Sequence, residues 1–195
     1  EVSDLGIVPD RREATVAALK TAADHHDLIL TSGGVSVGEE DHVKPAVQSL
    51  GELNLWQIAM KPGKPFAYGQ VRRQTAEGVA HFVGLPGNPV STAVTYHQLV
   101  VPALRHLAGE VFSPAETIIA QVLSPLKKQP GRMDFQRGLL SCPEGQNRVV
   151  SAGLQSSGVL SGMAKANCYI CLERERGAVA AGEWVSVIPF DRFIR

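Results

Sequence analysis

The chain has 195 residues, 44% of them hydrophobic, which is enough to bury a core in one or two domains. Its 19 Lys and Arg residues balance its 19 Asp and Glu residues, and a formal net charge of zero provides no long-range field for a nucleic acid or an acidic membrane surface. No apolar run approaches the length of a membrane span, so we expect neither nucleic acid nor membrane as a partner.

The first half of the chain alternates strand and helix signals. Because such alternation is typical of a parallel sheet with helices on both faces, it predicts a doubly wound, mostly parallel α/β domain over residues 1–111. Pro102 lies inside the last helix and predicts a kink near Gln98, since proline lacks the N–H that a helix needs. Strands are predicted at residues 5–8, 28–31, 54–60, 66–70 and 79–84, and helices at residues 12–26, 42–50 and 89–108.

The second half contains strand-like runs separated by turn signals, which predicts a small all-β barrel or sandwich over residues 112–195. Cys168 and Cys171 fall on opposite faces of one predicted strand. We therefore expect buried structural thiols in a reducing, cytoplasmic compartment, and neither a redox pair nor a zinc site. The strands are predicted at residues 117–123, 135–140, 148–152, 169–173 and 184–190.

A glycine turn follows the predicted strand at residues 28–31. Glycines let the backbone approach an anion, and the free N–H groups of the turn bind the oxygens of that anion. Three acids come next, at residues 39–41; they suit a metal ion or proton transfer, but they equally suit the cap of the next helix. The candidate residues of this loop are Ser32, Gly33, Gly34, Ser36, Glu40 and Asp41.

Two further loops follow predicted strands. Lys61 and Lys64 are held between prolines and a glycine, which suits phosphate or a metal oxyanion, although solvated turns also have this composition. The loop before the helix at residues 89–108 is expected to cap that helix and also to contact a ligand. Strand ends of a doubly wound sheet share one rim, so three such loops favour an anion and metal site. The candidate residues of the third loop are Pro86, Gly87, Asn88, Pro89 and Ser91.

A few other residues carry a weaker signal. Asp10 follows the first predicted strand, and it either caps the helix near residue 12 or faces the ligand; the pattern favours the cap. Arg137, near the end of a predicted strand, suits a phosphate or a partner acid. Ser157 lies in a polar loop, and His42 is the histidine that we keep open because it adjoins Asp41.

Five sequence runs carry a resemblance to a known family. They occur in family order and span nearly the whole chain, and on them the chain resembles the MoeA family of molybdopterin molybdenumtransferases, which is similar to the E domain of gephyrin. Related MogA-type adenylyltransferases share the α/β fold but have a different loop at residues 35–38 and lack the β half. The runs are TSGGVSVGEEDHVK, MKPGKPFAYG, GLPGNPVSTAV, GRMDFQRG and CLERERG…GEWVSVIPF.

The resemblance implies an enzyme that inserts molybdate into adenylylated molybdopterin and releases AMP with the help of Mg²⁺. It implies that Asp41, with Asp10 or Glu40, binds the metal, and that Lys61 and Lys64 neutralise oxyanion charge. Gln57 stands where the family has a lysine, which removes one charge from the implied site. The functional positions of the family fall on Asp10, Asp41, Lys61, Pro86, Pro89, Arg137 and Ser157.

The resemblance also implies a domain arrangement and partners. The α/β half corresponds to the third domain of the family, lacking its opening strand and helix, and the β half corresponds to the fourth. A homodimer is implied for the full-length protein, and a MogA-like adenylyltransferase as a partner. Two alternatives stay open: a gephyrin-like scaffold that binds a receptor, and a MogA-like adenylyltransferase.

Overall fold

The computed structural model describes residues 1–33 and 42–190. Their contacts divide the chain into two compact units, one made of Glu1–Ile58 with Pro65–Gly87 and the other of Ala59–Lys64 with Asn88–Arg195. Within the described ranges, no helix combines the length and the hydropathy that crossing a membrane requires. The division of sequence domains between residues 111 and 112 stays a prediction.

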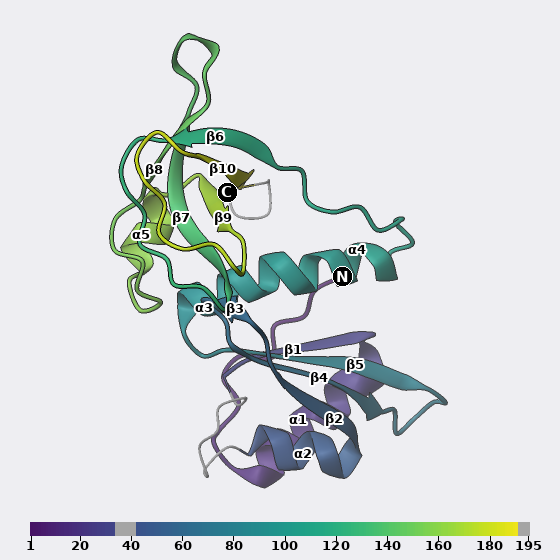
Figure 1. Ribbon diagram of the computed structural model, residues 1–195. Coiled ribbons are helices and arrows are strands. Elements are labelled where there is room, and N and C mark those ends of the chain that lie inside the picture. The colour runs from purple at the N-terminus through teal and green to yellow at the C-terminus, as the bar shows by residue number, and fades with distance from the viewer. Residues whose placement is uncertain (34–41, 191–195) are drawn as a thin grey trace. The chain divides into compact units, whose positions relative to one another are not determined.

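The first unit contains a mixed four-stranded sheet (Figure 1). β1 and β5 run parallel, whereas β4 runs antiparallel to both β5 and β2. The α/β class is confirmed, but the described sheet is mixed where we expected a mostly parallel one. The reason is that β2, β4 and β5 follow one another without the helical crossover that parallel neighbours need. In sheet order the strands are β1 (Leu28–Ser32), β5 (Val79–Leu85), β4 (Pro65–Arg72) and β2 (Gly51–Gln57).

Helices α1 (Arg12–His25) and α2 (Val43–Leu50) cover one face of this sheet (Figure 1). In β4 the buried positions alternate, and Ala67 and Val71 join Val47 of α2 in one apolar core. Because a shift of one residue would turn these side chains away from the helices, the apolar pattern fixes the register of β4.

Residues 1–9 form neither a helix nor a strand, so the predicted strand at residues 5–8 is wrong. Ile7 is 99% exposed and Val2 is 95% exposed. A strand needs a neighbour to pair its backbone groups, and no described strand pairs with this segment.

The second unit is built around a closed five-stranded barrel (Figure 1). β7 pairs with β8 and also with β9, and β6 and β10 complete the ring. The prediction of a barrel or sandwich is thus resolved in favour of the barrel, in which closure removes the unpaired edges. The strands are β6 (Ile118–Val122), β7 (Met133–Ser141), β8 (Arg148–Ser151), β9 (Cys168–Leu172) and β10 (Trp184–Pro189); short helices η2 (Pro143–Gly145) and α5 (Leu160–Lys165) lie between them in sequence.

The barrel core contains the two thiols of β9. Cys168 and Cys171 are free and buried, and burial raises the pKa of each to about 12. A thiol with such a pKa stays protonated at neutral pH, and only the thiolate is a good nucleophile or metal ligand. The prediction of buried structural thiols is therefore confirmed.

The helix predicted at residues 89–108 is continuous but changes type along its length. It comprises α3 (Pro89–Thr95), the π-helix η1 (Tyr96–Val100) and α4 (Val101–Leu107). Pro102 cannot donate to a carbonyl one turn earlier, and the wider π turn lies directly before it. The kink that we predicted near Gln98 therefore corresponds to a local π segment.

Candidate functional site

Three strands of the first unit end at the same edge of the sheet. Ser32 at the end of β1 pairs with Leu85 at the end of β5, and the Gly33 N–H donates to the Leu85 carbonyl at 3.0 Å. Gln57 at the end of β2 pairs with Pro65, where β4 begins. The register thus brings the carboxyl ends of β1, β5 and β2 to one edge, as the doubly wound arrangement predicted.

Two glycines pack against each other at this edge. Gly33 has φ +89°, a conformation that favours glycine, and a Cβ added to Gly87 would lie 3.6 Å from the Gly33 Cα. Pro86, which precedes Gly87 in sequence, is buried, and Ser32, which precedes Gly33, is exposed. The structure therefore brings together Ser32, Gly33, Pro86 and Gly87. Four further predicted residues, Gly34, Ser36, Glu40 and Asp41, lie outside the described residues.

Asp10 does not cap a helix. The N-cap residue of α1 is Arg11, and it makes no side-chain cap hydrogen bond. The Asp10 side chain is 84% exposed, and its Oδ1 lies 3.9 Å from Nε2 of His42. The capping interpretation that we favoured for Asp10 is thus wrong, and the residue pairs with the histidine that we kept open.

The loop that carries Lys61 and Lys64 belongs to the second unit. Gly63, at its centre, is buried with φ +107°, and a Cβ added there would overlap Oγ1 of Thr95 in α3 and lie 3.0 Å from Cε of Met60. Only glycine fits this approach, so the loop is packed against α3 and is not a solvated turn. Lys64 is exposed at its far end.

Lys61 has an acidic partner that the sequence analysis missed. β3 (Met60–Lys61) adds to barrel strand β7 in parallel register, with Lys61 opposite Asp134. Lys61 Nζ lies 3.3 Å from Oδ2 of Asp134, which is 4% exposed. A signal was present, because Asp134 directly precedes the predicted strand at residues 135–140, and an acid that is buried in a barrel requires a partner.

A cavity of about 220 Å³ lies beside this ion pair. Four of its seven lining residues are cationic and one is acidic, which makes its wall strongly positive. The lining residues are Lys61, Lys127, Lys128, Gln129, Pro130, Arg132 and Asp134.

Three predicted site residues, Asn88, Pro89 and Ser91, lie at the start of α3. Asn88 occupies the N-cap position, but its side chain makes no cap hydrogen bond, and its Oδ1 is buried without a partner among the described residues. Pro89 opens the helix, where its missing N–H costs nothing, and Ser91 is 7% exposed. Asn88 thus holds the cap position as predicted, while the backbone carbonyl, and not its side chain, satisfies Thr92 at 2.8 Å.

Arg137 is 1% exposed and faces no acid within ion-pair distance in the described residues. Its NH2 group donates to the carbonyls of Leu154 at 2.7 Å and Ser156 at 3.0 Å. Burial lowers the pKa of Arg137, while the charge of Asp134 acts in the opposite direction. The structure thus connects Arg137 with the polar loop that carries Ser157.

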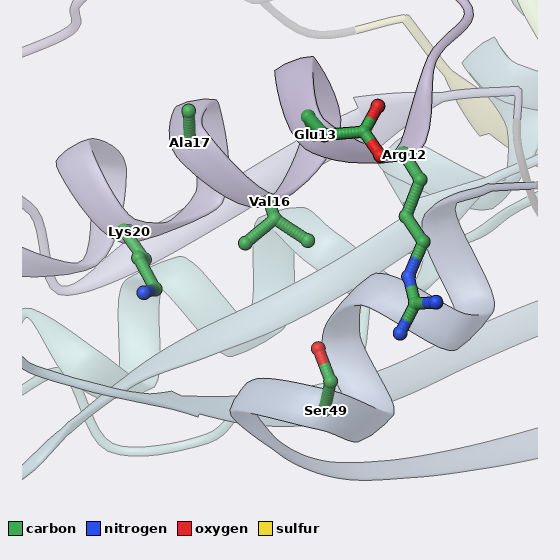
Figure 2. A pocket seen from close by; sticks show the side chains of 6 residues that line it. All are labelled: Arg12, Glu13, Val16, Ala17, Lys20 and Ser49. Carbon is green, nitrogen blue, oxygen red and sulfur yellow. The ribbon is translucent and has the colours of Figure 1, made fainter.

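Another cavity, of about 460 Å³, lies between α1 and α2 (Figure 2). It contains none of the predicted site residues. Nor do the described residues contain any group of three His, Cys, Asp or Glu side chains that could hold a metal ion. The cavity between the helices is lined by Arg12, Glu13, Val16, Ala17, Lys20 and Ser49.

Comparison with known proteins gives two family matches along the chain. Residues 1–106 match a family described as a probable molybdopterin binding domain, and residues 120–190 match the MoeA C-terminal region, domain IV. All of this chain aligns, at 45% identity over 196 residues, with the molybdopterin molybdenumtransferase of Haemophilus influenzae. The chain belongs to the MoeA family.

Other relatives and solved structures resemble nearly all of this chain. Gephyrin of Dictyostelium discoideum is 30% identical over 94% of this chain. The molybdopterin biosynthesis moea protein from Pyrococcus horikosii superposes with a TM-score of 0.73 at 26% identity, over 95% of this chain and 43% of that structure. The chain spans 47% of the Haemophilus relative and 28% of the gephyrin.

Proposed function

We propose that this chain carries part of the active site of a molybdopterin molybdenumtransferase, which inserts molybdate into adenylylated molybdopterin and releases AMP. The observation that carries the proposal is the alignment of the whole chain with the Haemophilus enzyme at 45% identity. An enzyme of molybdenum cofactor biosynthesis also accounts for the family matches of residues 1–106 and 120–190.

Lys61 and Lys64 supply positive charge for the oxygens of molybdate or of a phosphate. Packing of Gly63 against α3 fixes the backbone between them, so the two ammonium groups are carried on a rigid support. The Lys61 side chain is 44% exposed and Lys64 is exposed, which leaves both within reach of a ligand. A fixed pair of charges stabilises an oxyanion without reorganising during the reaction.

The sheet edge that carries Gly33 and Gly87 is proposed to supply backbone N–H donors to the ligand. Ser32, Gly33 and Gly87 provide small side chains or none, which allows a ligand to approach the main chain. Gly34 and Ser36, which lie outside the described residues, are further proposed binding positions, and the buried Pro86, which has no N–H, is proposed to fix the backbone before Gly87. In the second unit, the proposed binding residues are Asn88, Pro89, Ser91, Arg137 and Ser157.

Mg²⁺ is the proposed metal, and Asp41, with Glu40 or Asp10, is its proposed ligand set. Carboxylate oxygens are the donors that Mg²⁺ prefers, and the exposed Asp10 carboxylate, paired with His42 at 3.9 Å, is available for such a role. When bound, the metal would neutralise phosphate charge at the bond that releases AMP. The protein groups would orient that phosphate and exclude water from it.

The experiment is a chimaera in which this chain replaces the aligned part of the Haemophilus enzyme. Purified chimaera is mixed with adenylylated molybdopterin, molybdate and Mg²⁺, and AMP release is measured. Release that requires both ions is expected. A chimaera that folds and assembles as the parent enzyme does, yet releases no AMP, would contradict the proposal. A matched chimaera with Lys61→Ala tests whether the lysine loop takes part.

The same proposal includes a cytoplasmic homodimer that receives its substrate from a MogA-like adenylyltransferase. The alternative in which this chain is itself the adenylyltransferase is less favoured, because residues 120–190 match MoeA domain IV. Adenylylation of molybdopterin by ATP, measured with the same chimaera, separates these two activities.

A further inference from the structure

We propose that Asp134 is a positioning residue, which holds the Lys61 ammonium group in place for an oxyanion. This inference rests on the proposed oxyanion role of Lys61 and adds a residue to it. Lys61 Nζ donates a hydrogen bond to Asp134 Oδ2 at 3.3 Å. The two residues are 73 positions apart, so the contact depends on the pairing of β3 with β7.

Asp134 is itself firmly held. Gln136 Nε2 donates to the same Oδ2 atom at 3.1 Å and to the carbonyl of Lys127 at 2.8 Å. The backbone is fixed as well, because the Met133 N–H donates to the carbonyl of Ala59 at 2.8 Å, directly before β3. A buried carboxylate held in this way offers Lys61 one preferred position.

Lys61 is a half-exposed lysine of the cavity whose ammonium group keeps donors for a ligand. An ammonium group has three donors, and the described contacts of Lys61 use one of them, on Asp134. Lys128, in contrast, donates to the carbonyls of Gln129 and Arg132 at 3.0 and 2.8 Å, and to that of Arg174 at 3.4 Å. Lys128 therefore holds the cavity wall together, whereas Lys61 can present its remaining N–H groups to a ligand.

The positioning role of Asp134 and its negative charge predict opposite effects of Asp134→Asn on oxyanion affinity. Its negative charge opposes any anion nearby, so Coulomb interaction alone predicts that Asp134→Asn strengthens oxyanion binding. Positioning predicts the reverse, because the freed Lys61 side chain must be ordered again when the anion binds. The sign of the change therefore separates the two roles.

The test is titration calorimetry of the 195-residue chain with inorganic molybdate. We expect Asp134→Asn to weaken binding about tenfold, within the range of coupling between contacting side chains. In a Lys61→Met background the same substitution should cause no weakening. Asp27→Asn is the matched control, since it removes an equal charge from an ion pair with Arg73, and it should leave the affinity unchanged. Unchanged or stronger binding by Asp134→Asn would overturn the inference.

A measurement without ligand tests the positioning directly. In ¹H–¹⁵N spectra the hydrogen-bonded Lys61 ammonium should exchange slowly and give a signal that Asp134→Asn abolishes. If wild-type chain gives this signal but binds no molybdate, the positioning stands and the proposed oxyanion role fails. A signal that is missing in the wild type, or that survives in Asp134→Asn, overturns the positioning.

A second variant covers the case in which Asp134→Asn does not fold. Asp134→Glu keeps the charge but lengthens the side chain, so any change comes from position alone. We expect a shifted Lys61 signal and molybdate affinity about threefold weaker, between those of the wild type and a Lys61→Met variant. An unshifted signal with unchanged affinity would overturn the inference.

Discussion

The side-chain amide of Gln155 pairs with the backbone of Arg137 as a neighbouring strand would. The Arg137 N–H donates to Gln155 Oε1 at 2.8 Å, and Gln155 Nε2 donates to the Arg137 carbonyl at 2.9 Å. Asn167 does the same for Leu140, with bonds of 2.7 and 2.9 Å. Two amide side chains thus satisfy backbone groups of β7, and one of them fixes the residue whose guanidinium binds the neighbouring loop.

Gln155→Leu is expected to lower the free energy of unfolding by about 1–3 kcal/mol, because it leaves the Arg137 N–H without its acceptor, while the Arg137 carbonyl keeps the hydrogen bond from the Ala152 N–H. Urea denaturation measures this loss. Gln129→Leu serves as a control, since Gln129 is exposed and its side chain makes no hydrogen bond within the described residues. Equal stability of the two variants would show that the strand-like pairing contributes little.

Gly63→Ala should destabilise the second unit by about 2–4 kcal/mol more than a matched glycine substitution does. The matched site is Gly131, whose φ of +106° is close to the +107° of Gly63. A Cβ added to Gly131 would point into open space. Backbone strain is thus nearly equal at the two sites, and the difference reports overlap with Thr95. Thermal unfolding of both variants gives the comparison; similar losses of stability would mean that α3 moves aside at little cost.

The two buried thiols predict a loss of stability at high pH. Their folded pKa of about 12 lies above the ordinary value of 9.0, so the unfolded chain releases these protons first as the pH rises. The contribution is fully present below pH 9 and is lost between pH 9 and pH 12, at about 1.4 kcal/mol per pH unit for each thiol. Urea denaturation at pH 8 and pH 10 measures the fall.

Replacement identifies the thiols as the cause of that pH dependence. The double variant Cys168→Ala and Cys171→Ala should show a smaller fall between pH 8 and pH 10. Cys142→Ala should keep the full fall, because Cys142 is exposed. If the double variant loses as much stability as the wild type, other groups are responsible.

Asp41→Asn is expected to raise the Mg²⁺ concentration needed for half-maximal AMP release by about tenfold or more in the Haemophilus chimaera. The reason is that an amide is a poorer ligand for Mg²⁺ than a carboxylate. Glu39→Gln is the control, as it removes an acid of the same run that is not assigned to the metal. Equal Mg²⁺ dependence of the wild-type chimaera and Asp41→Asn would remove Asp41 from the ligand set.

The secondary structure was largely predictable because it follows from local patterns. The apolar run at residues 79–84 became β5, and the β half gave all five barrel strands. Pairing was less predictable, since strand neighbours depend on contacts between distant residues. The sheet was expected to be mostly parallel, and the segment at residues 5–8 was expected to be a strand although no described strand pairs with it.

The candidate site shows the same limit. The lysine loop was recognised from its prolines and glycine, but the alternative of a solvated turn could be rejected only when Gly63 was seen against Thr95. Asp134 was missed because its partner is 73 residues away. Asp10 was expected to cap α1, but it lies near His42 instead.

Ala59–Lys64 groups with the barrel although both flanking segments belong to the sheet unit, so the chain passes between the units three times. A single cut therefore cannot separate the two units cleanly. If two relatives exchanged their barrels by recombination at one boundary near residue 111, the barrel of one parent would have to pair with the β3 segment of the other parent. Such hybrids would inherit Lys61 from one parent and its partner Asp134 from the other, so these two segments are expected to be inherited together.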